Sequence, residues 1–406
     1  KSIVPQPDGV ENMSGPLSGI RVVDLSNVVS GPMAVQVLAD QGADVIKVEQ
    51  PGAGDTSRNM GAMSNGMGAL FAILNRNKRS IVLDMQQAAA AEVMRDLVAS
   101  CDVIVQNFRP GAMQRMGLDY PALRKINESI IYASISGFGQ DGPYSNRRVY
   151  DPIIQGITGF VDTQTTKGDA NPQLIKNIVC DKATALTAAQ AITAALFARE
   201  RGEGGQALEV AMVDVGLSFL WPDGMWNNTY LNDDVQPMPS LSDIYRVTKT
   251  SDGYITSLVV SDAEWQSMCR AIKRDDLAND EKYMNVLNRI KNISELIPLL
   301  DGEIAKWKTD ELCGRLDAED VPFAKINMVD EVYRDPQIAH RGSVVEVEHP
   351  TAGPMRMPVP VARFGATPSE IRFMAPTFGE HTDEILIEIG RDKAAIKALR
   401  EQDAVA

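Results

Sequence analysis

The chain has 406 residues, with 40 Lys and Arg against 54 Asp and Glu, so its formal net charge is -14. A field of that sign repels phosphate backbones, and we therefore exclude nucleic acid as a partner. No stretch approaches the roughly 20 apolar residues of a membrane helix, and the first residues lack the basic and apolar blocks of a signal peptide. We expect a cytoplasmic globular protein that does not associate with membranes.

The cysteines and histidines narrow the possible chemistry. The four cysteines are far apart and show no CxxC or zinc-type spacing, so we expect free thiols and no metal. The three histidines are His340, His349 and His381. A histidine-based triad or a two-histidine metal site in the N-terminal half is therefore excluded.

Apolar runs alternate with helical periods from residue 20 onward. This pattern is typical of parallel strands joined by helical crossovers. Strands are predicted at 20–26, 44–50, 79–85, 102–108 and 130–139, and helices at 31–43 and 86–101. The sequence therefore predicts a large, doubly wound, Rossmann-like parallel sheet of the α/β class.

The composition changes after residue 214. A stretch rich in Pro, Asn, Asp and Trp is interpreted as a linker. A hairpin at 245–260 and helical segments to about residue 320 follow, and then two strands within 342–364 and a helix at 382–392. We expect a disordered tail at 1–15, a large α/β domain beginning at 16–220, the linker at 221–243, a smaller α+β domain at 244–325, and a segment at 326–406 that returns to the large domain.

A glycine motif follows one of the predicted strands. The sequence GFGQDG places Gly137, Gly139 and Gly142 in the G-x-G-x-x-G spacing of a dinucleotide-binding loop. Such a loop opens a helix with an apolar face, whereas PYSNRRVYDP follows here. We therefore interpret the three residues as glycines of a flexible loop, which argues against a nucleotide-dependent oxidoreductase.

Asp181 stands where an apolar run becomes an alanine-rich helical pattern. One interpretation is structural, because aspartate is a favoured N-cap and Gly202 lies where a C-terminal cap belongs. The other is chemical, because a helix N-terminus stabilises an ionised carboxylate and its free amides can bind a developing oxyanion. The two interpretations are compatible, and the pattern leaves both open.

Cationic residues recur near the predicted strand ends. The basic run at 75–80 is typical of a solvated turn, although Lys78 and Arg79 are also candidates for phosphate contacts. The other cations at strand ends are Arg109, Arg115, Arg147 and Arg148. Open α/β sheets bind ligands at the carboxyl ends of their strands, so this set favours an anionic, phosphate-bearing ligand.

Ordered blocks over nearly the whole chain resemble the class III CoA-transferase family, the superfamily of formyl-CoA and carnitine CoA-transferases and α-methylacyl-CoA racemases. The blocks are PLSGIRVVDLSNVVSGPMAVQVLADQGADVIKVEQPGAGDTSR (16–58), NRNKRSIVLDM (75–85), DVIVQNFRPGAMQRMGLDY (102–120), ISGFGQDGPYSNRRVYDPIIQ (135–155), GEGGQALEVAMVD (202–214) and FGEHTDEIL (378–386). The resemblance implies reversible transfer of CoA from an acyl-CoA to a carboxylic acid.

In this family an aspartate that matches Asp181 is the nucleophile. The resemblance implies that its carboxylate attacks the donor thioester to give a mixed aspartyl anhydride, and that CoA thiolate then returns to give an aspartyl-CoA thioester. Aspartate, with a reference pKa of roughly 3.9, is ionised near neutral pH and needs no general base. Coenzyme A enters as a substrate, no metal or redox cofactor is implied, and we expect a small organic or dicarboxylic acid as acceptor.

The residue that precedes Asp151 separates the branches of the family. The racemases carry a histidine before an acidic residue, whereas this chain has Tyr150 and Asp151, which resemble the tyrosine-acid pair of the transferases. A tyrosine with an unperturbed pKa of about 10 is a poor base for proton exchange. This pair therefore favours a transferase over a racemase. The structural alternative for Tyr150 is a packed aromatic side chain at the start of a helix.

Matching motifs also carry over the coenzyme contacts, which are Val28, Asn107, Phe108, Arg115 and Arg148. Two departures separate this chain from formyl-CoA:oxalate transferases. Those enzymes have a glutamine at the position of Val29 and a glycine-rich loop that has no counterpart at 221–260, so we do not expect oxalate or formate as substrates. An arginine of that branch falls at Gln50, which leaves phosphate binding to other cations.

The family resemblance also implies an interlocked homodimer, in which the small domain of one subunit approaches the active site of the other. Two alternatives to CoA transfer remain open at this point. One is racemisation or epimerisation of a 2-methylacyl-CoA. The other is a non-catalytic acyl-CoA-binding protein in which Asp181 serves only as a helix cap.

Overall fold

The computed structural model describes residues 15–165 and 171–406, so the tail predicted at 1–15 lies outside these ranges except for Gly15. The chain forms two compact units. One contains the residues up to Asp162 together with Gln173–Trp226 and His340–Ala406, and the other consists mainly of Asn227–Ala339. Of the helices within the described ranges, none combines the length and apolar character needed to span a bilayer.

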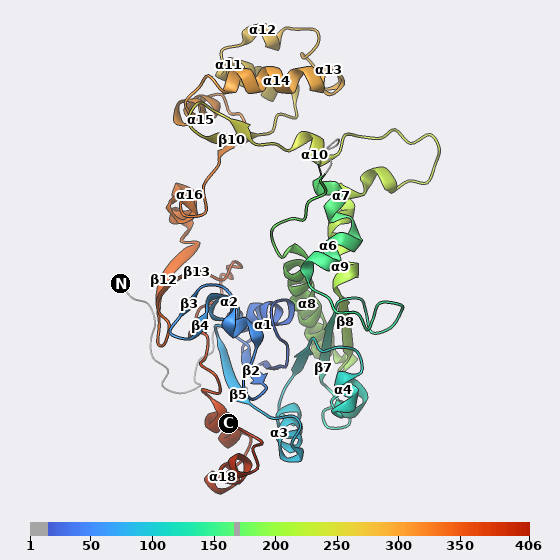
Figure 1. Cartoon of the computed structure of the whole chain (residues 1–406), viewed down its shortest axis with the longest axis vertical. Coiled ribbons are helices and arrows are strands. Elements are labelled where there is room, and N and C mark those ends of the chain that lie inside the picture. The colour runs from blue at the N-terminus through green and yellow to red at the C-terminus, as the bar shows by residue number, and fades with distance from the viewer. Residues whose placement is uncertain (1–14, 166–170) are drawn as a thin grey trace. The chain divides into compact units, whose positions relative to one another are not determined.

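A six-stranded parallel sheet forms the centre of the first unit (Figure 1). In sheet order its strands are β5 (Lys78–Val82), β2 (Asp44–Glu49), β1 (Arg21–Asp24), β6 (Val103–Gln106), β7 (Ile131–Ser136) and β8 (Ala207–Ala211). Every neighbouring pair is parallel. The predicted α/β class and parallel sheet are confirmed. Strand order reverses between β1 and β6, and open α/β sheets bind ligands beyond the carboxyl ends of strands at such a point.

Helices cover both faces of this sheet. On one face the core includes residues of α1 (Ser30–Asp40) and α8 (Val179–Ala198), and on the other it includes residues of α3 (Ala88–Ala99), α17 (Thr382–Glu388) and α18 (Lys393–Glu401). Successive residues of a strand point to opposite faces, so Val22 belongs to the first core and Val23 to the second. The sheet is therefore doubly wound, and residues from the last part of the chain complete one of its two cores.

The last residues also extend the sheet edge. Val405 forms an antiparallel bridge with Leu83, and the Asp84 amide donates to the carbonyl oxygen of Ala404 at 3.0 Å. Both Ala404 and Val405 are buried. The segment that follows the second unit is thus an integral part of the first.

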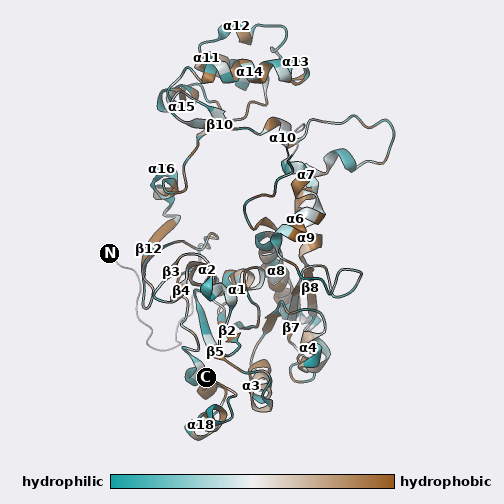
Figure 2. Ribbon diagram, in the orientation of Figure 1, coloured by the Kyte–Doolittle hydropathy of each residue, from teal (hydrophilic) through white to brown (hydrophobic). Residues whose placement is uncertain are grey.

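Strand β5 carries charged residues into the core. Figure 2 shows this strand in teal, yet all five of its residues are buried. Lys78 lies 2.9 Å from Asp24, and Arg79 lies 2.9 Å from Asp44. The interpretations of 75–80 as a solvated turn, and of its two cations as phosphate contacts, are both wrong because carboxylates within the fold neutralise these side chains.

The remaining elements of the first unit connect or flank the sheet. They are β3 (Met63–Ser64), β4 (Met67–Gly68), α2 (Ala69–Leu74), α4 (Ala112–Arg115), α5 (Tyr120–Leu123), α6 (Asp151–Thr158), α9 (Met212–Gly224), α16 (Pro336–Arg341, at the boundary), β12 (Val344–His349) and β13 (Gly353–Pro358). The two strands within 342–364 form an antiparallel hairpin. Helix α9 runs to Gly224, so the chain is still helical where the linker at 221–243 was expected to begin.

The second unit contains a small antiparallel sheet and helices. Its strands, in the order β11 (Phe323–Lys325), β10 (Tyr254–Ser257) and β9 (Thr248–Lys249), pack with residues of the helices around an apolar core of their own. The helices are α10 (Leu241–Ile244), α11 (Asp262–Ala271), α12 (Asp275–Ala278), α13 (Val286–Lys291), α14 (Ile293–Ile304) and α15 (Thr309–Ala318), and α7 (Phe160–Gln164) lies where the chain leaves the first unit. The predicted hairpin at 245–260 forms with its turn at 251–253.

The glycine motif at 137–142 has a structural explanation. A Cβ on Gly137 would lie 2.3 Å from a methyl carbon of Val149, and Gly139 and Gly142 adopt φ angles of +91° and +85°. The motif continues into a loop and opens α6 only at Asp151. These glycines therefore permit a close approach and left-handed turns within a loop, as the sequence predicted.

We predict that Gly137→Ala lowers the free energy of unfolding by roughly 1–3 kcal/mol, because the added methyl group meets the branched side chain of Val149. Chemical denaturation of the purified protein measures the change. The matched control is Gly156→Ala in α6, where a Cβ meets nothing within 4 Å and the better helix former adds up to about 1 kcal/mol. Equal effects of the two substitutions would contradict the steric explanation.

Candidate active site at the carboxyl edge of the sheet

The loops that follow β1 and β6 are joined to each other. The backbone amide of Asn27 donates to Oδ1 of Asn107 at 2.9 Å, and Nδ2 of Asn107 donates to the carbonyl oxygen of Asn27 at 2.8 Å. The Phe108 amide is fixed in turn by Oε1 of Gln106 at 2.8 Å. Three predicted coenzyme contacts, Val28, Asn107 and Phe108, therefore stand together where strand order reverses.

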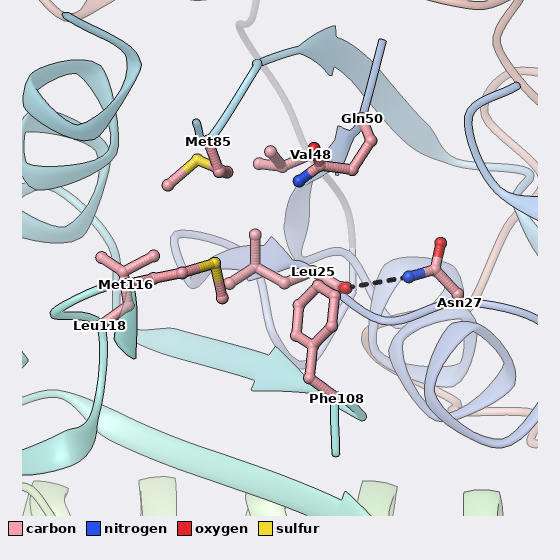
Figure 3. Close-up of a pocket in the computed structure, with 8 residues that line it drawn as sticks. All are labelled: Leu25, Asn27, Val48, Gln50, Met85, Phe108, Met116 and Leu118. Atoms are coloured by element: carbon pink, nitrogen blue, oxygen red, sulfur yellow. Dashed lines mark hydrogen bonds between the residues drawn. The ribbon is translucent and has the colours of Figure 1, made fainter. Parts of the chain in front are cut away.

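A recess opens at the same edge (Figure 3). Eight residues line it: Leu25, Asn27, Val48, Gln50, Met85, Phe108, Met116 and Leu118. The two methionines lie on one side of Leu25 in Figure 3, and Asn27 lies on the other. The lining offers aromatic, thioether and amide groups and no cation, so it holds no charged partner for a phosphate. Gln50, the departure noted in the sequence, is part of this neutral wall.

Asp181 lies in the first turn of α8 and does not cap it. The N-cap position belongs to Ile178, whose side chain makes no capping hydrogen bond, and the helix begins at Val179. The interpretation of Asp181 as the N-cap is therefore wrong. Asp181 is the third residue of the helix, so its side chain does not accept the hydrogen bond that an N-cap side chain accepts. The residue is only partly buried.

A carboxylate from another helix accepts a hydrogen bond from the first turn of α8. Oδ2 of Asp151, the first residue of α6, accepts the backbone amide of Asp181 at 2.9 Å, and Asp151 is 2% exposed. Its other oxygen accepts from Nε2 of Gln155 at 2.6 Å, one helical turn further along α6. Two carboxylates thus lie close together, and Asp151 is held in place by its hydrogen bonds with the Asp181 amide and with Gln155.

This surrounding changes the acidity of Asp181. Burial raises the pKa of its carboxyl group, and the nearby charge of Asp151 raises it further. Hydrogen bonds from the side chain and the backbone of Ser30, at the start of α1, act in the opposite direction. The net effect is a pKa of about 6, so the carboxylate is ionised at neutral pH but poorly stabilised.

The other predicted site residues are less enclosed. Tyr150 occupies the N-cap position of α6 and is 70% exposed, so the packed aromatic considered for this position is wrong for the chain as described. Arg115 and Arg148 are exposed, and Arg147 stacks on Tyr144 with its guanidinium carbon 3.7 Å from the ring centroid.

Two residues of this site were missed in the sequence. Gln155 was detectable, because an amide four residues after an acid lies on the same helix face. Ser30 was not, since 150 or so residues separate it from Asp181 and only the packing of α1 against α8 brings them together. Over the described ranges, no cluster of three or more His, Cys, Asp or Glu side chains is arranged to hold a metal ion.

A doubly wound sheet with a paired carboxylate and a neutral recess at its carboxyl edge is a suitable frame for an acyl-transferring enzyme. Residues 17–382 match the model of a known family, described as CoA-transferase family III. The chain belongs to CoA-transferase family III and is a CoA-transferase, and the resemblance drawn from the sequence is confirmed.

Known relatives match over most of their length. A succinate–glutarate CoA-transferase of Agrobacterium fabrum is 35% identical over 394 residues, which are 93% of this chain and 96% of that protein. A formyl-CoA:oxalate CoA-transferase of Escherichia coli O157:H7 is 30% identical over 418 residues, or 97% of this chain and 100% of that one. The crystal structure of a CAIB/BAIF family protein from Brucella suis superposes with a TM-score of 0.81 at 34% identity, covering 93% of this chain and 100% of the other.

We predict that Asp181→Asn stabilises the fold at pH 7.5, by on the order of 1 kcal/mol. The folded state holds the proton of Asp181 more tightly than the unfolded state, whose pKa is near 3.8. Its contribution to stability is therefore lost as pH rises from about 4 to about 6, and asparagine has no such loss. Denaturant unfolding at pH 4 and pH 7.5 should show a gain only at the higher pH.

Asp214→Asn is the matched control for this measurement. Asp214 is also the third residue of its helix, α9, but it is exposed. A carboxylate there interacts favourably with the helix dipole, so its replacement should lower stability slightly at pH 7.5. Substitutions that change stability in the same direction at both positions would argue against electrostatic destabilisation at Asp181.

Proposed function

We propose that this enzyme transfers CoA from an acyl-CoA to a small organic or dicarboxylic acid, with Asp181 as its covalent nucleophile. The observation that carries the proposal is the pairing of Asp181 with Asp151 at the carboxyl edge, which leaves one carboxylate ionised and weakly stabilised. The names of the relatives, which include succinate and glutarate, support a dicarboxylic acceptor. The differences at Val29 and at 221–260 argue against oxalate.

The first half of the proposed reaction loads the enzyme. An oxygen of Asp181 attacks the thioester carbonyl carbon of the donor, the carbon–sulfur bond breaks, and CoA leaves as its thiolate. The product is a mixed anhydride between the acyl group and Asp181. The thiolate then attacks the aspartyl carbonyl carbon, so the donor acid departs as a carboxylate and CoA becomes attached to Asp181 as a thioester.

The second half repeats these exchanges with the acceptor. The acceptor carboxylate attacks the aspartyl thioester, releases CoA thiolate and forms a new anhydride with Asp181. Attack by the thiolate on the acceptor carbonyl gives the new acyl-CoA and restores the aspartate. Each step exchanges one activated acyl bond for another, so no water or external proton is consumed.

The electrostatics of the carboxylate pair favour the loading step. Free Asp181 is a negative charge beside the buried Asp151, and the repulsion between them disappears when Asp181 becomes a neutral anhydride or thioester. The same environment raises the basicity, and hence the nucleophilicity, of the attacking oxygen. Asp151 therefore contributes to catalysis by position and charge. We propose that Tyr150, which is next to Asp151 and exposed, contacts the bound substrate.

The coenzyme is proposed to lie across the loops after β1 and β6. Val28, Asn107 and Phe108 are proposed to line its path, since the hydrogen bonds between Asn27 and Asn107 join these two loops. The exposed cations Arg115 and Arg148 are proposed to meet its phosphates, since Gln50 cannot do so.

A homodimer is proposed as the working form. Helix α8 has no charged residue between Lys182 and Arg199, yet Leu186 and Phe197 on this stretch are 53% and 63% exposed. The neighbouring helices α6 and α9 also expose large apolar side chains, namely Ile153, Ile157, Leu217, Phe219 and Trp221. These exposed apolar side chains on three helices that contact one another support burial against a second copy.

We predict that acyl-CoA labels Asp181. Incubation with succinyl-CoA or glutaryl-CoA, followed by hydroxylamine or borohydride, should leave a hydroxamate or an alcohol at this residue alone, located by peptide mass spectrometry. Asp181→Ala and Asp181→Asn should lose the label and reduce CoA transfer by roughly 10³-fold or more. Asp214→Asn should retain both.

The same experiment separates the alternative functions. Deuterium from solvent at the α-carbon of a 2-methylacyl-CoA, without transfer or label, would indicate a racemase. Tight binding of acyl-CoA with neither label nor exchange would indicate a binding protein. Either result contradicts covalent CoA transfer by Asp181, and a panel of oxalate, succinate and glutarate as acceptors tests the substrate class.

We also predict that the chain sediments and scatters light at twice its 44.2 kDa mass. The double variant Leu186→Glu/Phe197→Glu should shift it toward the monomer, because charges on both positions oppose burial of that face. Leu287→Glu introduces the same change at a 74% exposed leucine of α13 and serves as the control. A wild-type monomer, or a double variant that stays dimeric, would contradict the assignment of this face.

A further inference from the structure

One buried side chain links helix α6 to the segment that leads into α8. Residues 173–178 form neither helix nor strand, and the N-cap residue Ile178 makes no side-chain cap. Gln155, on the second turn of α6, is 2% exposed. Its Oε1 accepts the Ile175 amide at 2.9 Å, and its Nε2 donates to the carbonyl oxygens of Ile175 and Asn177 at 3.2 and 3.1 Å. This side chain therefore ties the chain to α6 just before α8 begins.

The direction of the Gln155 amide is unambiguous. The backbone N–H of Ile175 can only donate, so the atom that faces it is the amide oxygen. The carbonyl oxygens of Ile175 and Asn177 can only accept, so the amide nitrogen faces them. The same nitrogen lies 2.6 Å from Oδ1 of Asp151. Gln155 thus presents a hydrogen-bond donor to this carboxylate.

Asp151 connects the Gln155 amide to the helix that carries Asp181. Its Oδ1 accepts from Gln155, and its Oδ2 accepts from the backbone amide of Asp181 at 2.9 Å. The Asp181 amide precedes the bond from the Lys182 amide to the carbonyl oxygen of Ile178, at 3.2 Å, with which the helical pattern begins. Amides this early in a helix have no intrahelical acceptor, so Asp151 supplies the one that the helix lacks.

We infer that Gln155 is a positioning residue for CoA transfer, acting through the Asp151 carboxylate to hold the first turn of α8, and with it Asp181, in place against α6. The inference rests on the proposed role of Asp181 as nucleophile. Gln155 holds the chain directly at 175–177, before the helix, and through Asp151 at position 181, inside its first turn. Its function is thus to place the nucleophile without touching the reacting atoms.

An amide is the side chain that these contacts require. A glutamate of the same shape could still accept the Ile175 amide, but it would set a second anion against the buried Asp151. An apolar side chain of similar size would remove the donor that Gln155 gives to this carboxylate. In either case Asp151 loses a contact that fixes it, and the charge that raises the pKa of Asp181 is no longer held in place.

The test compares Gln155→Glu with Asn127→Asp in the whole chain. Asn127 makes matching backbone contacts, because its Nδ2 donates to the carbonyl oxygens of Val98 and Cys101 at 3.1 and 2.7 Å and its Oδ1 accepts the Ser129 amide at 3.1 Å. We expect Gln155→Glu to lower kcat by about 10- to 100-fold and to change the KM for acyl-CoA by less than about threefold. Asn127→Asp should lower stability and leave kcat unchanged.

The exchanged pair Asp151→Asn/Gln155→Glu separates positioning from simple support of the segment before α8. An amide at 151 can accept from the Asp181 amide and donate to a carboxylate at 155, which restores the link with donor and acceptor reversed. The carbonyl oxygens of Ile175 and Asn177 still lack their donor. We expect kcat at least about fivefold above that of Gln155→Glu. An exchanged pair no faster than Gln155→Glu, or a folded Gln155→Glu with wild-type kcat, would overturn the inference.

Gln155→Met covers the case in which Gln155→Glu does not fold, because methionine keeps the length of the side chain and adds no charge. It should lower kcat by about tenfold in the wild type and by less than about threefold in an Asp151→Asn background. Both partners of position 151 are donors, and asparagine has one oxygen, so one of the two contacts is already lost in that background. Equal losses in the two backgrounds would overturn the inference.

A second readout is independent of catalysis. Hydrogen exchange at the Asp181 amide, measured by mass spectrometry with residue-level fragmentation, reports the contact with Asp151. Exchange should be at least about tenfold faster in Gln155→Met and unchanged in Asn127→Asp. If the wild type transfers no CoA, the proposed function fails. Unchanged exchange at Asp181 in Gln155→Met rejects the positioning contact, whether or not the wild type is active.

Discussion

Two lysines, Lys47 and Lys78, are completely buried in the sheet, and they determine the geometry of its carboxyl edge. Nζ of Lys47 lies 2.9 Å from Asp55 and 3.9 Å from Asp24, and Nζ of Lys78 lies 2.9 Å from Asp24. An isolated charge in this interior would be very unfavourable, so the two cations and two carboxylates must stay together. The network joins β1, β2, β5 and the loop after β2, and its carboxylates accept the backbone amides of Ser26 and Val28 in the loop between β1 and α1.

The candidate site also depends on buried carboxylates, but there no cation neutralises them. In the network each carboxylate meets a cation, and the pKa values of Asp24 and Asp55 fall despite burial. At the start of α8 the buried Asp151 meets Asp181 without a cation between them, and the pKa of Asp181 rises. A charge-compensated core thus stands beside an uncompensated carboxylate pair, and such perturbed groups are typical of functional sites.

The sequence predicted the parts of this arrangement that depend on local pattern. Alternating apolar runs indicated the parallel sheet, and the ordered sequence blocks over nearly the whole chain indicated a CoA-transferase. Local pattern failed where the deciding partner is distant. Asp181 was weighed as a cap because aspartate is a common N-cap, but the cap comes from Asp151, 30 residues earlier. The basic run around Arg79 has the composition of a turn, yet Arg79 is buried and donates hydrogen bonds to Glu384 and Glu388, some 300 residues later.

The contribution of the last residues to the first unit constrains how the protein is made. Leu83 leaves the ribosome some 300 residues before its bridging partner Val405. The helices α17 and α18, which complete one core of the sheet, also come late. A nascent chain therefore carries an open sheet edge while the intervening residues are made, and chaperones have time to influence the closure of this unit.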